Sequence, residues 1–182
     1  MVELHCHLDG SLRASTLKEL LQKKNYPIPK DIKFYPGMGI HEALSRFQTT
    51  LSVLQDPEAV ERVVEEICLD ARAYGHSYTE IRFAPQLHHG APIQKIVDAA
   101  ISGLCEYSSI ILCGLYGEHP EILSTLVEIA ATRDDITGID LAGAPLPSHK
   151  WSMMDYIEPF NKARKYGLGR TVHAGEGRSP KE

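Results

Sequence analysis

The sequence predicts an α/β fold built from repeated strand–helix units. Short apolar runs rich in β-branched residues alternate with amphipathic helical stretches along the whole chain. This alternation is typical of parallel βαβ units. The run Ile110-Ile111-Leu112 is apolar at every position, which suits a strand covered on one side and packed on the other. A doubly wound sheet and a (β/α)8 barrel both fit this pattern.

The positions of the chemically distinctive residues favour the barrel. His5 and His7 end the first expected strand, Gly143 follows the fourth, and His173 and Glu176 follow the fifth. In a (β/α)8 barrel, functional groups from several strands gather at the carboxyl ends of those strands, around one mouth. We therefore expect a TIM-type barrel.

Local patterns predict the elements of the first third of the chain. The first strand, residues 2–7, breaks at Asp9-Gly10, and a short helix with an apolar face follows and runs to about Lys24. Residues 25–39 are rich in proline and lysine and predict a loop. Apolar residues then recur at helical spacing over residues 41–54.

Prolines and glycines mark the later boundaries. Asp56-Pro57-Glu58 opens a longer helix with an N-cap residue, a rigid first position and an acidic first turn. Gly75 ends that helix, and Gly167 ends the last one, because glycine readily adopts the left-handed stop conformation. The other strands are expected at residues 77–85, 109–116, 136–142 and 169–173, and the other helices at residues 93–107, 120–132 and 155–166.

The chain is short for a complete barrel. It has 182 residues and five expected strands, whereas an eight-stranded barrel typically takes about 250 residues. We therefore expect residues 1–182 to be the N-terminal part of a single barrel domain whose C-terminal part is absent. Open first and fifth strands would be exposed sheet edges, which favour aggregation.

The composition is that of an ordinary globular protein, with 43% hydrophobic and 24% charged residues. A formal net charge of −5 and the lack of a Lys/Arg cluster argue against a nucleic-acid partner. No apolar run approaches the roughly 20 residues of a membrane helix, and the N-terminus has no signal-peptide pattern. We expect a cytoplasmic protein with no membrane partner.

The four cysteines show no Cys-x-x-Cys spacing, so neither a thiolate zinc site nor a disulfide framework is indicated. We interpret them as reduced, and three of them as core side chains.

The pair His5 and His7 is the strongest functional signal. In an extended strand, successive side chains point to opposite faces, so both imidazoles project one way and Cys6 the other. Neutral imidazole is a preferred zinc ligand, and His173 would add a third nitrogen from a distant strand. Glu176 would place a carboxylate nearby. Without His173 and its context, two half-buried, hydrogen-bonded strand histidines would be the better interpretation.

Three motifs, in order, resemble those of the adenosine deaminase family. They are Val2-Glu3-Leu4-His5-Cys6-His7-Leu8-Asp9-Gly10-Ser11, Gly138-Ile139-Asp140-Leu141-Ala142-Gly143 and Arg170-Thr171-Val172-His173-Ala174-Gly175-Glu176. The similarity runs essentially from the first residue to the last. It implies a barrel enzyme of purine salvage that uses zinc to convert adenosine, and 2'-deoxyadenosine, to inosine and ammonia.

The resemblance also implies roles for the residues at the strand ends. His5, His7 and His173 match the family's ligands for one Zn²⁺ per active site, and Glu176 matches its proton donor. A purine ring resists attack at C6 until N1 accepts a proton, which a carboxylic acid with a raised pKa can supply. A fourth ligand and a hydroxide-positioning histidine would come from later strands, so activity is expected to need the C-terminal half of the barrel.

Three positions are expected to contact the purine nucleoside substrate, and they are His7, Asp9 and Gly143. From the residues alone, Asp9 is equally well a turn residue, because Asp-Gly is a common turn dipeptide. The family has an aspartate at this position that contacts the ribose. Gly143 matches a glycine whose backbone approaches the purine, which the lack of a Cβ allows, although it is also an ordinary loop glycine. Asp140, in an otherwise apolar strand, is a candidate orienting carboxylate.

The chain departs from the family in two places. Ala144-Pro145 stands where the family has acidic residues, and Gly117-Glu118 stands where it has an arginine. Both departures leave the preferred purine substituent open. His88-His89 and His119 follow the second and third strands and are interpreted as solvent-facing or rim residues.

Two alternative functions remain. One is a related amidohydrolase-type deaminase that acts on adenine or on a modified adenine nucleoside. Adenine-acting relatives tend to carry Ile-Glu-Gly where this chain has Leu8-Asp9-Gly10, which favours a nucleoside. The other is a truncated, non-catalytic metal-binding or interaction protein. The Pro-Cys-x-x-Cys motif that cytidine-type zinc deaminases combine with His-x-Glu does not occur.

Overall fold

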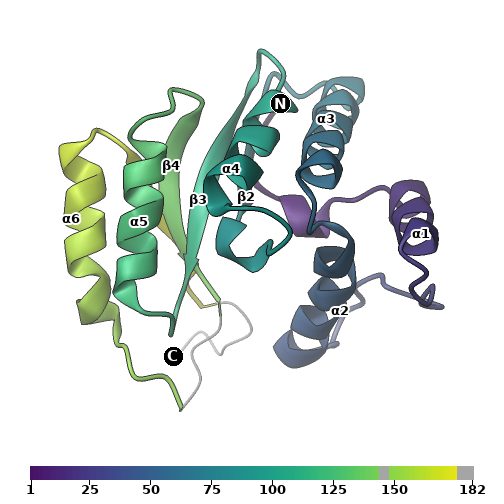
Figure 1. Ribbon diagram of the computed structural model, residues 1–182, viewed down its shortest axis with the longest axis horizontal. Coiled ribbons are helices and arrows are strands. Elements are labelled where there is room, and N and C mark those ends of the chain that lie inside the picture. The colour runs from purple at the N-terminus through teal and green to yellow at the C-terminus, as the bar shows by residue number, and fades with distance from the viewer. Residues whose placement is uncertain (144–147, 176–182) are drawn as a thin grey trace. The chain divides into compact units, whose positions relative to one another are not determined.

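The computed structural model describes residues 1–143 and 148–175. Its five strands form one sheet in which neighbours in space are neighbours in sequence, in the order β1-β2-β3-β4-β5 (Figure 1). This order excludes the doubly wound alternative, in which the strand order reverses within the sheet. The strands are β1 (Val2–His7), β2 (Tyr78–Phe83), β3 (Ser108–Leu115), β4 (Ile136–Ala142) and β5 (Gly169–Val172).

The pairing of β4 with both of its neighbours is parallel. Ile111 of β3 lies opposite Gly138 of β4, after an irregularity between Ile110 and Ile111. On the other side Gly138 lies opposite Gly169 of β5. A Cβ on Gly138 would lie 2.9 Å from the carbonyl oxygen of Gly169, so a larger residue there would force β4 and β5 apart. The parallel register brings the carboxyl ends of these strands to the same edge of the sheet.

The chain divides into two compact units. The first comprises residues 1–81 and 86–108, and the second comprises residues 82–85 and 109–182. The expectation that residues 1–182 form part of one barrel domain stays a prediction.

The first unit is built around a pair of packed helices, α3 and α4. Val60, Val63 and Val64 of α3 and Ile96 and Val97 of α4 have no exposed surface, because both helices present an apolar stripe to their neighbours. The helices of this unit are α1 (Ala14–Lys23), α2 (Ile40–Val53), α3 (Pro57–Ala73) and α4 (Ile93–Ser102), with 3-10 turns η1 (Leu8–Gly10) and η2 (Pro85–Leu87) at the ends of β1 and β2.

The second unit contains β3, β4 and β5 and two helices that lie side by side, α5 (Pro120–Ala130) and α6 (Ile157–Lys165) (Figure 1). Leu112 and Ile139 of the sheet and Leu126 and Val127 of α5 are completely buried. The 3-10 turn η3 (Met153–Tyr156) leads into α6. The helix cover fits the burial of β3 and β4, which are buried at nearly every position.

Most expected boundaries are confirmed. Gly75 and Gly167 have φ angles of 76° and 75°, as expected of left-handed helix stops. Asp56 occupies the N-cap position of α3, but its side chain makes no capping hydrogen bond and instead accepts one from Nζ of Lys24 at 2.5 Å.

Two helix predictions are wrong at their ends. The helix expected over residues 93–107 ends at Ser102, because Gly103 is pressed against α3 and the hydroxyl of Ser108 accepts from the backbone N–H of Cys105. The helix expected to begin at residue 155 begins at Ile157. The turn before it is a 3-10 turn held by a capping box between Ser152 and Asp155.

The cysteine prediction is partly wrong. All four cysteines are free, as expected. Cys68 and Cys113 are buried, whereas Cys6 is half-buried and Cys105 is exposed, so two rather than three are core side chains.

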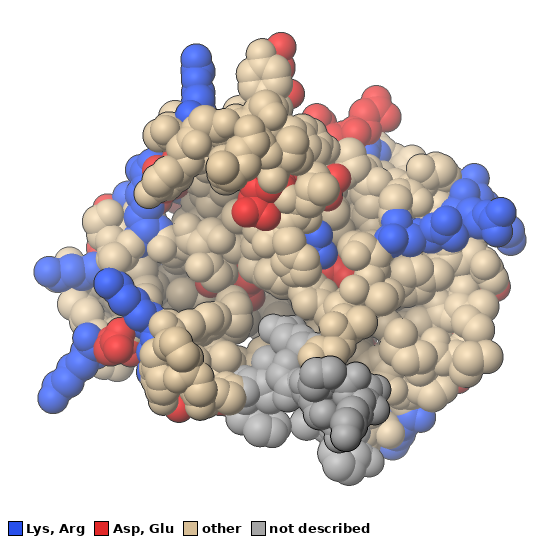
Figure 2. All heavy atoms as spheres, turned by 180° about the vertical axis from the view of Figure 1, so that it is seen from behind, with Lys and Arg blue, Asp and Glu red and all other residues tan. Residues whose placement is uncertain are grey.

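Charged side chains are dispersed on the face drawn in Figure 2. Lys and Arg lie there in several separate groups, with Asp and Glu among them. Within the described residues, no helix combines the length and the apolar character needed to cross a membrane.

Candidate functional site

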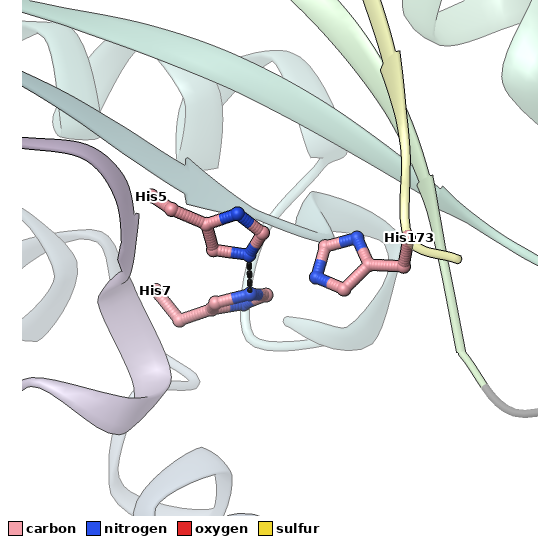
Figure 3. A group of neighbouring side chains, drawn as sticks. All are labelled: His5, His7 and His173. Carbon is pink, nitrogen blue, oxygen red and sulfur yellow. Dashed lines mark hydrogen bonds between the residues drawn. The ribbon is translucent and has the colours of Figure 1, made fainter. Parts of the chain in front are cut away.

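Strand β1 places His5 and His7 on the same side, as the period of a strand requires. Their Nε2 atoms lie 3.1 Å apart, and their ring centroids are 5.1 Å apart (Figure 3). His5 is exposed and His7 half-buried. Cys6, the residue between them, instead lies near Ser11, with Sγ 3.3 Å from Oγ. The expected separation of the two imidazoles from the thiol is confirmed.

The spacing of the two imidazole nitrogens fits a shared metal ion. Zinc bonds imidazole nitrogen at about 2.0–2.1 Å in tetrahedral geometry, which places two ligand nitrogens roughly 3.3 Å apart. The observed separation of 3.1 Å is close to that value. The pair can therefore bind one ion with little movement of either ring.

His173 follows β5 and is fixed by both its backbone and its ring. Its backbone N–H donates to the carbonyl oxygen of Leu141 at 2.9 Å, which extends the β4–β5 pairing by one residue. Its Nδ1 lies 2.9 Å from Oδ2 of Asp140. A carboxylate can only accept, so a hydrogen on Nδ1 would face Asp140 and leave the lone pair of Nε2 for a metal.

Asp140 is the centre of a buried polar group in the second unit. It has no exposed surface, and its Oδ2 accepts from Nη1 of Arg82 at 2.8 Å and from the thiol of Cys113 at 3.6 Å. Burial opposes ionisation of Asp140, but the hydrogen bond from His173 and the charge of Arg82 outweigh it and hold the pKa below its usual value. Asp140 is therefore a carboxylate beside His173, and the orienting role expected for it stays a prediction.

Arg82 is a partner of Asp140 that was not predicted from the sequence. Its side chain is 3% exposed in the structure, although arginine is almost never buried without a partner. The available signal was an arginine in the otherwise apolar second half of β2, Ile81-Arg82-Phe83. A buried cation in a strand implies a buried anion in a neighbouring one, and Asp140 is the acidic residue of β4.

Asp9 lies in η1, directly after the histidine pair. Burial raises its pKa to about 6, although the backbone N–H groups of Asp9 and Gly10 partly oppose the shift. Among the described residues, its buried Oδ1 has no hydrogen-bond partner. Such an atom is costly unless a donor reaches it, which makes Asp9 suited to accepting from a ligand hydroxyl.

Gly143 follows β4 and has a φ of 88°. The nearest atom to a Cβ built on it would be the backbone nitrogen of Tyr116 at 3.5 Å, which is ordinary contact. Backbone conformation, rather than lack of space, therefore explains glycine at this position. Glu176, the expected proton donor, and Ala144-Pro145 lie outside the described residues.

Gly117, one of the positions where the family has an arginine, also has a positive φ, of 98°. A Cβ there would lie 2.4 Å from Nδ1 of His149. The backbone N–H of Gly117 donates to the hydroxyl of Tyr156 at 2.8 Å. The positive φ and the close His149 side chain both favour glycine at this position.

The interpretation of His88 as a solvent-facing or rim residue is wrong. Its side chain is 3% exposed, and Nδ1 is hydrogen-bonded to the carbonyl oxygen of Leu54. Burial lowers its pKa, so it is a neutral core histidine of the first unit. His119 is exposed, as expected, and its Nδ1 accepts from the backbone N–H of Glu121 as the N-cap of α5.

The model of a known protein family, adenosine deaminase, matches residues 1–182. A probable adenosine deaminase from Dictyostelium discoideum is 37% identical, over 96% of this chain and 25% of the relative. The adenosine deaminase of Clostridium acetobutylicum is 35% identical, and that of Enterococcus faecalis 30%, each over 96% of this chain and 57% of the relative. The chain thus spans a quarter to just over half of the length of these relatives.

Solved structures show the same fold. The apo N6-methyl-AMP deaminase of Arabidopsis thaliana superposes with a TM-score of 0.81 at 27% identity, over 99% of this chain and 59% of that one. Arabidopsis ADAL in complex with GMP gives 0.82 at 26% identity, over 100% and 60%. With the strand order, this likeness confirms a TIM-type (β/α)8 barrel, of which residues 1–182 cover about the first five strand–helix units. The chain belongs to the adenosine deaminase family.

Proposed function

We propose that the complete protein is a zinc-dependent deaminase that converts adenosine and 2'-deoxyadenosine to inosine or 2'-deoxyinosine and ammonia. The observation that supports this most directly is the His5–His7 pair, whose Nε2 atoms lie 3.1 Å apart at the end of β1 in a member of this family. Relatives that carry the name adenosine deaminase are 30–37% identical to this chain.

The proposed ligands of a single Zn²⁺ are His5, His7 and His173, the three side chains drawn in Figure 3, each of which offers one ring nitrogen. Three imidazoles match the donor set of known catalytic zinc sites. The carboxylate of Asp140 against Nδ1 of His173 matches the outer partner that zinc-binding histidines usually have. When bound, zinc lowers the pKa of a coordinated water and so supplies a nucleophile at neutral pH.

The protein side chains have complementary roles in the proposed reaction. Glu176 donates a proton to N1 of the purine, so that C6 becomes electrophilic enough to accept the oxygen of water. The water gives up two protons, one to the carboxylate of Glu176 and one to the exocyclic nitrogen. The bond between C6 and that nitrogen then breaks, and the nitrogen leaves as ammonia. Asp140, whose Oδ2 lies 2.9 Å from Nδ1 of His173, is proposed to orient that ring toward the metal.

Asp9 and Gly143 are proposed to position the nucleoside together with His7. With a pKa of about 6, Asp9 is ionised at neutral pH, so its buried Oδ1 can accept from a ribose hydroxyl. The backbone of Gly143, held at positive φ, would face the purine.

A second candidate substrate class is the modified adenine nucleotides. The relatives of solved structure with 26–27% identity include an N6-methyl-AMP deaminase and complexes with GMP and IMP. The resemblance places a family arginine near Gly117 or Glu118, and this chain has none there, which leaves the preferred purine substituent open. The higher identity to named adenosine deaminases still favours adenosine.

The test is to purify the complete protein, measure its zinc content, and compare kcat/KM for adenosine, 2'-deoxyadenosine, adenine and N6-methyl-AMP. We expect about one zinc per chain and the highest kcat/KM with the two nucleosides. A preference for N6-methyl-AMP or adenine would support the alternative of a deaminase that acts on those substrates. Stoichiometric zinc without release of ammonia or methylamine would favour the non-catalytic alternative.

A further inference from the structure

The first unit contains a cavity of about 500 Å³ that none of the proposed site residues lines. It is formed by the second half of α3, the chain entering β2, and the segment that joins α4 to β3. We call it the cysteine cavity, because two of the four cysteines line it. Its lining includes Cys68, Arg72, His76, Gly103, Cys105 and Tyr107.

Close packing of the helices brings the two cysteines to this cavity from different elements. Cys68 lies on α3, and Cys105 lies just after α4. A Cβ on Gly103 would lie 2.4 Å from the carbonyl oxygen of Glu61, so glycine lets the end of α4 rest directly on α3. The backbone N–H of Thr79 donates to the carbonyl oxygen of Tyr107 at 3.0 Å, which ties the following residues to β2.

Ser108 links the two cysteines. Its hydroxyl lies 3.3 Å from Sγ of Cys68, accepts from the backbone N–H of Cys105 at 3.0 Å, and donates to the carbonyl oxygen of Cys105 at 2.8 Å. The same hydroxyl thus contacts the thiol of Cys68 and the backbone of Cys105. The pair is thus held in one small cluster, although 36 other residues separate the two in sequence.

The two thiols have different environments. Cys68 is 4% exposed, and burial raises the pKa of its thiol. Cys105 is exposed to solvent. Partial burial opposes its ionisation, but hydrogen bonds from Ser108 and from the backbone N–H of Tyr107, together with the Cys68 thiol, lower its pKa. An accessible thiol of lowered pKa beside a second thiol is the arrangement found in redox-sensitive proteins.

We propose that Cys68 and Cys105 form a peroxide-sensitive thiol pair, with Cys105 the thiol that is oxidised first and Cys68 the thiol that resolves it. The Cys105 thiolate attacks hydrogen peroxide, so that an S–O bond forms, the O–O bond breaks, and hydroxide leaves and is protonated to water. Cys105 is oxidised by two electrons to the sulfenic acid. The Cys68 thiol then attacks this sulfur, an S–S bond forms, and the S–O bond breaks with loss of a second water.

The other cysteines serve as internal controls. Cys113 is 2% exposed and donates to the buried carboxylate of Asp140, and Cys6 lies between the histidines of β1 and near Ser11. Neither lines the cysteine cavity. The proposed chemistry needs no zinc and no substrate, so its outcome is independent of the proposed deaminase activity.

The test uses the complete, reduced protein treated with hydrogen peroxide and then alkylated. Digestion with trypsin and chymotrypsin separates the cysteines, because cleavage after Tyr107 divides Cys105 from Cys113. We expect one cross-linked peptide pair, Cys68 with Cys105, lighter by two hydrogens and restored by dithiothreitol. Cys105 should be alkylated on the order of tenfold faster than Cys68 in the untreated protein.

Three serine variants distinguish the roles. Cys105→Ser should abolish the cross-link, Cys113→Ser should leave it unchanged, and Cys68→Ser should stop the reaction at a sulfenic acid on Cys105 that dimedone captures. The proposal is overturned if peroxide yields no cross-link, if the cross-link joins other cysteines, or if dimedone fails to label Cys105 in Cys68→Ser. Each variant is checked by circular dichroism, and a misfolded serine variant is replaced by the alanine variant.

Discussion

The central strands β3 and β4 differ sharply from the outer strands β1 and β5. All of the residues 109–114 of β3 are buried, and β4 has one exposed residue, whereas β5 has no buried residue and β1 has none either. The proposed metal ligands lie at the ends of the exposed strands. The central strands supply stability through apolar burial, whereas the outer strands carry the proposed ligands and gain little burial from residues 1–182 themselves.

One residue connects the two kinds of strand. Asp140 belongs to the buried strand β4, yet its carboxylate holds the ring of His173, which follows the exposed strand β5. The proposed ligand that follows the weakly buried strand thus contacts a group in the core. The following experiments test this difference between central and outer strands, from the largest expected effect to the smallest.

The largest effect is expected from removing everything beyond residue 182. Residues 1–182 alone should not deaminate adenosine at an enzymatic rate, and they should associate through the edges of β1 and β5. Adding the C-terminal remainder in trans should restore turnover. The measurements are inosine formation and light scattering. Efficient turnover by a monodisperse chain of residues 1–182 would contradict the expectation that this piece alone is inactive and associates through β1 and β5.

Replacing a ligand on β1 should have the next largest effect. In the complete protein, His5→Ala or His7→Ala should lower zinc affinity by more than the roughly 10–100-fold that loss of an outer partner costs. Cys6→Ala is the matched control, because Cys6 lies between the two histidines and contacts Ser11 instead. Competition with a chelator measures the affinity. A Cys6 variant that lost zinc equally would refute the conclusion that His5 and His7 share one face of β1 and that Cys6 lies on the other.

Glu176, after β5, is expected to act on the proton rather than on the metal. Glu176→Gln should retain zinc and fold but lose about 10²–10⁴-fold in kcat, because an amide cannot protonate N1. Zinc content and kcat are measured together. Near-native turnover would remove Glu176 from the mechanism.

Removing the contact between Asp140 of β4 and His173 should have a smaller effect. Asp140→Asn should lower zinc affinity by about 10–100-fold, since the amide no longer fixes the tautomer of His173. Cys113→Ala is the control, because it removes a neighbour of Oδ2 but leaves Arg82 and His173 in contact with Asp140. An unchanged zinc affinity in Asp140→Asn would show that His173 is oriented without the core.

The smallest effect on the metal is expected in the centre of β3. Leu112→Ala should lower the free energy of unfolding by about 2–5 kcal/mol, because the side chain is fully buried. Zinc affinity should stay within error of the wild-type value. Chemical denaturation and chelator competition separate the two quantities, and a matching loss of zinc would mean that core and ligand strands are not distinct.

Much of the fold follows from the sequence because its signals are local. The strand–helix alternation predicts every strand and most helices, and Gly75 and Gly167 mark helix ends because the left-handed conformation is intrinsic to glycine. The alternation of side chains along a strand places His5 and His7 together and Cys6 apart. Family resemblance then connects these residues with His173, Glu176, Asp9 and Gly143, whose combined roles stay predictions.

The tertiary structure alone decided the features that depend on distant partners. The helix after Ile93 ends at Ser102 because Gly103 meets α3, a contact that residues 93–107 do not contain. His88 is a buried, neutral histidine whose Nδ1 is hydrogen-bonded to the carbonyl oxygen of Leu54, although its position in a loop predicted an exposed side chain. Arg82 and Asp140 lie in different strands, and their pairing shows only when those strands fold. Local conformational preference is written in the sequence, whereas burial of a charge or a thiol is set by the residues that the fold brings against it.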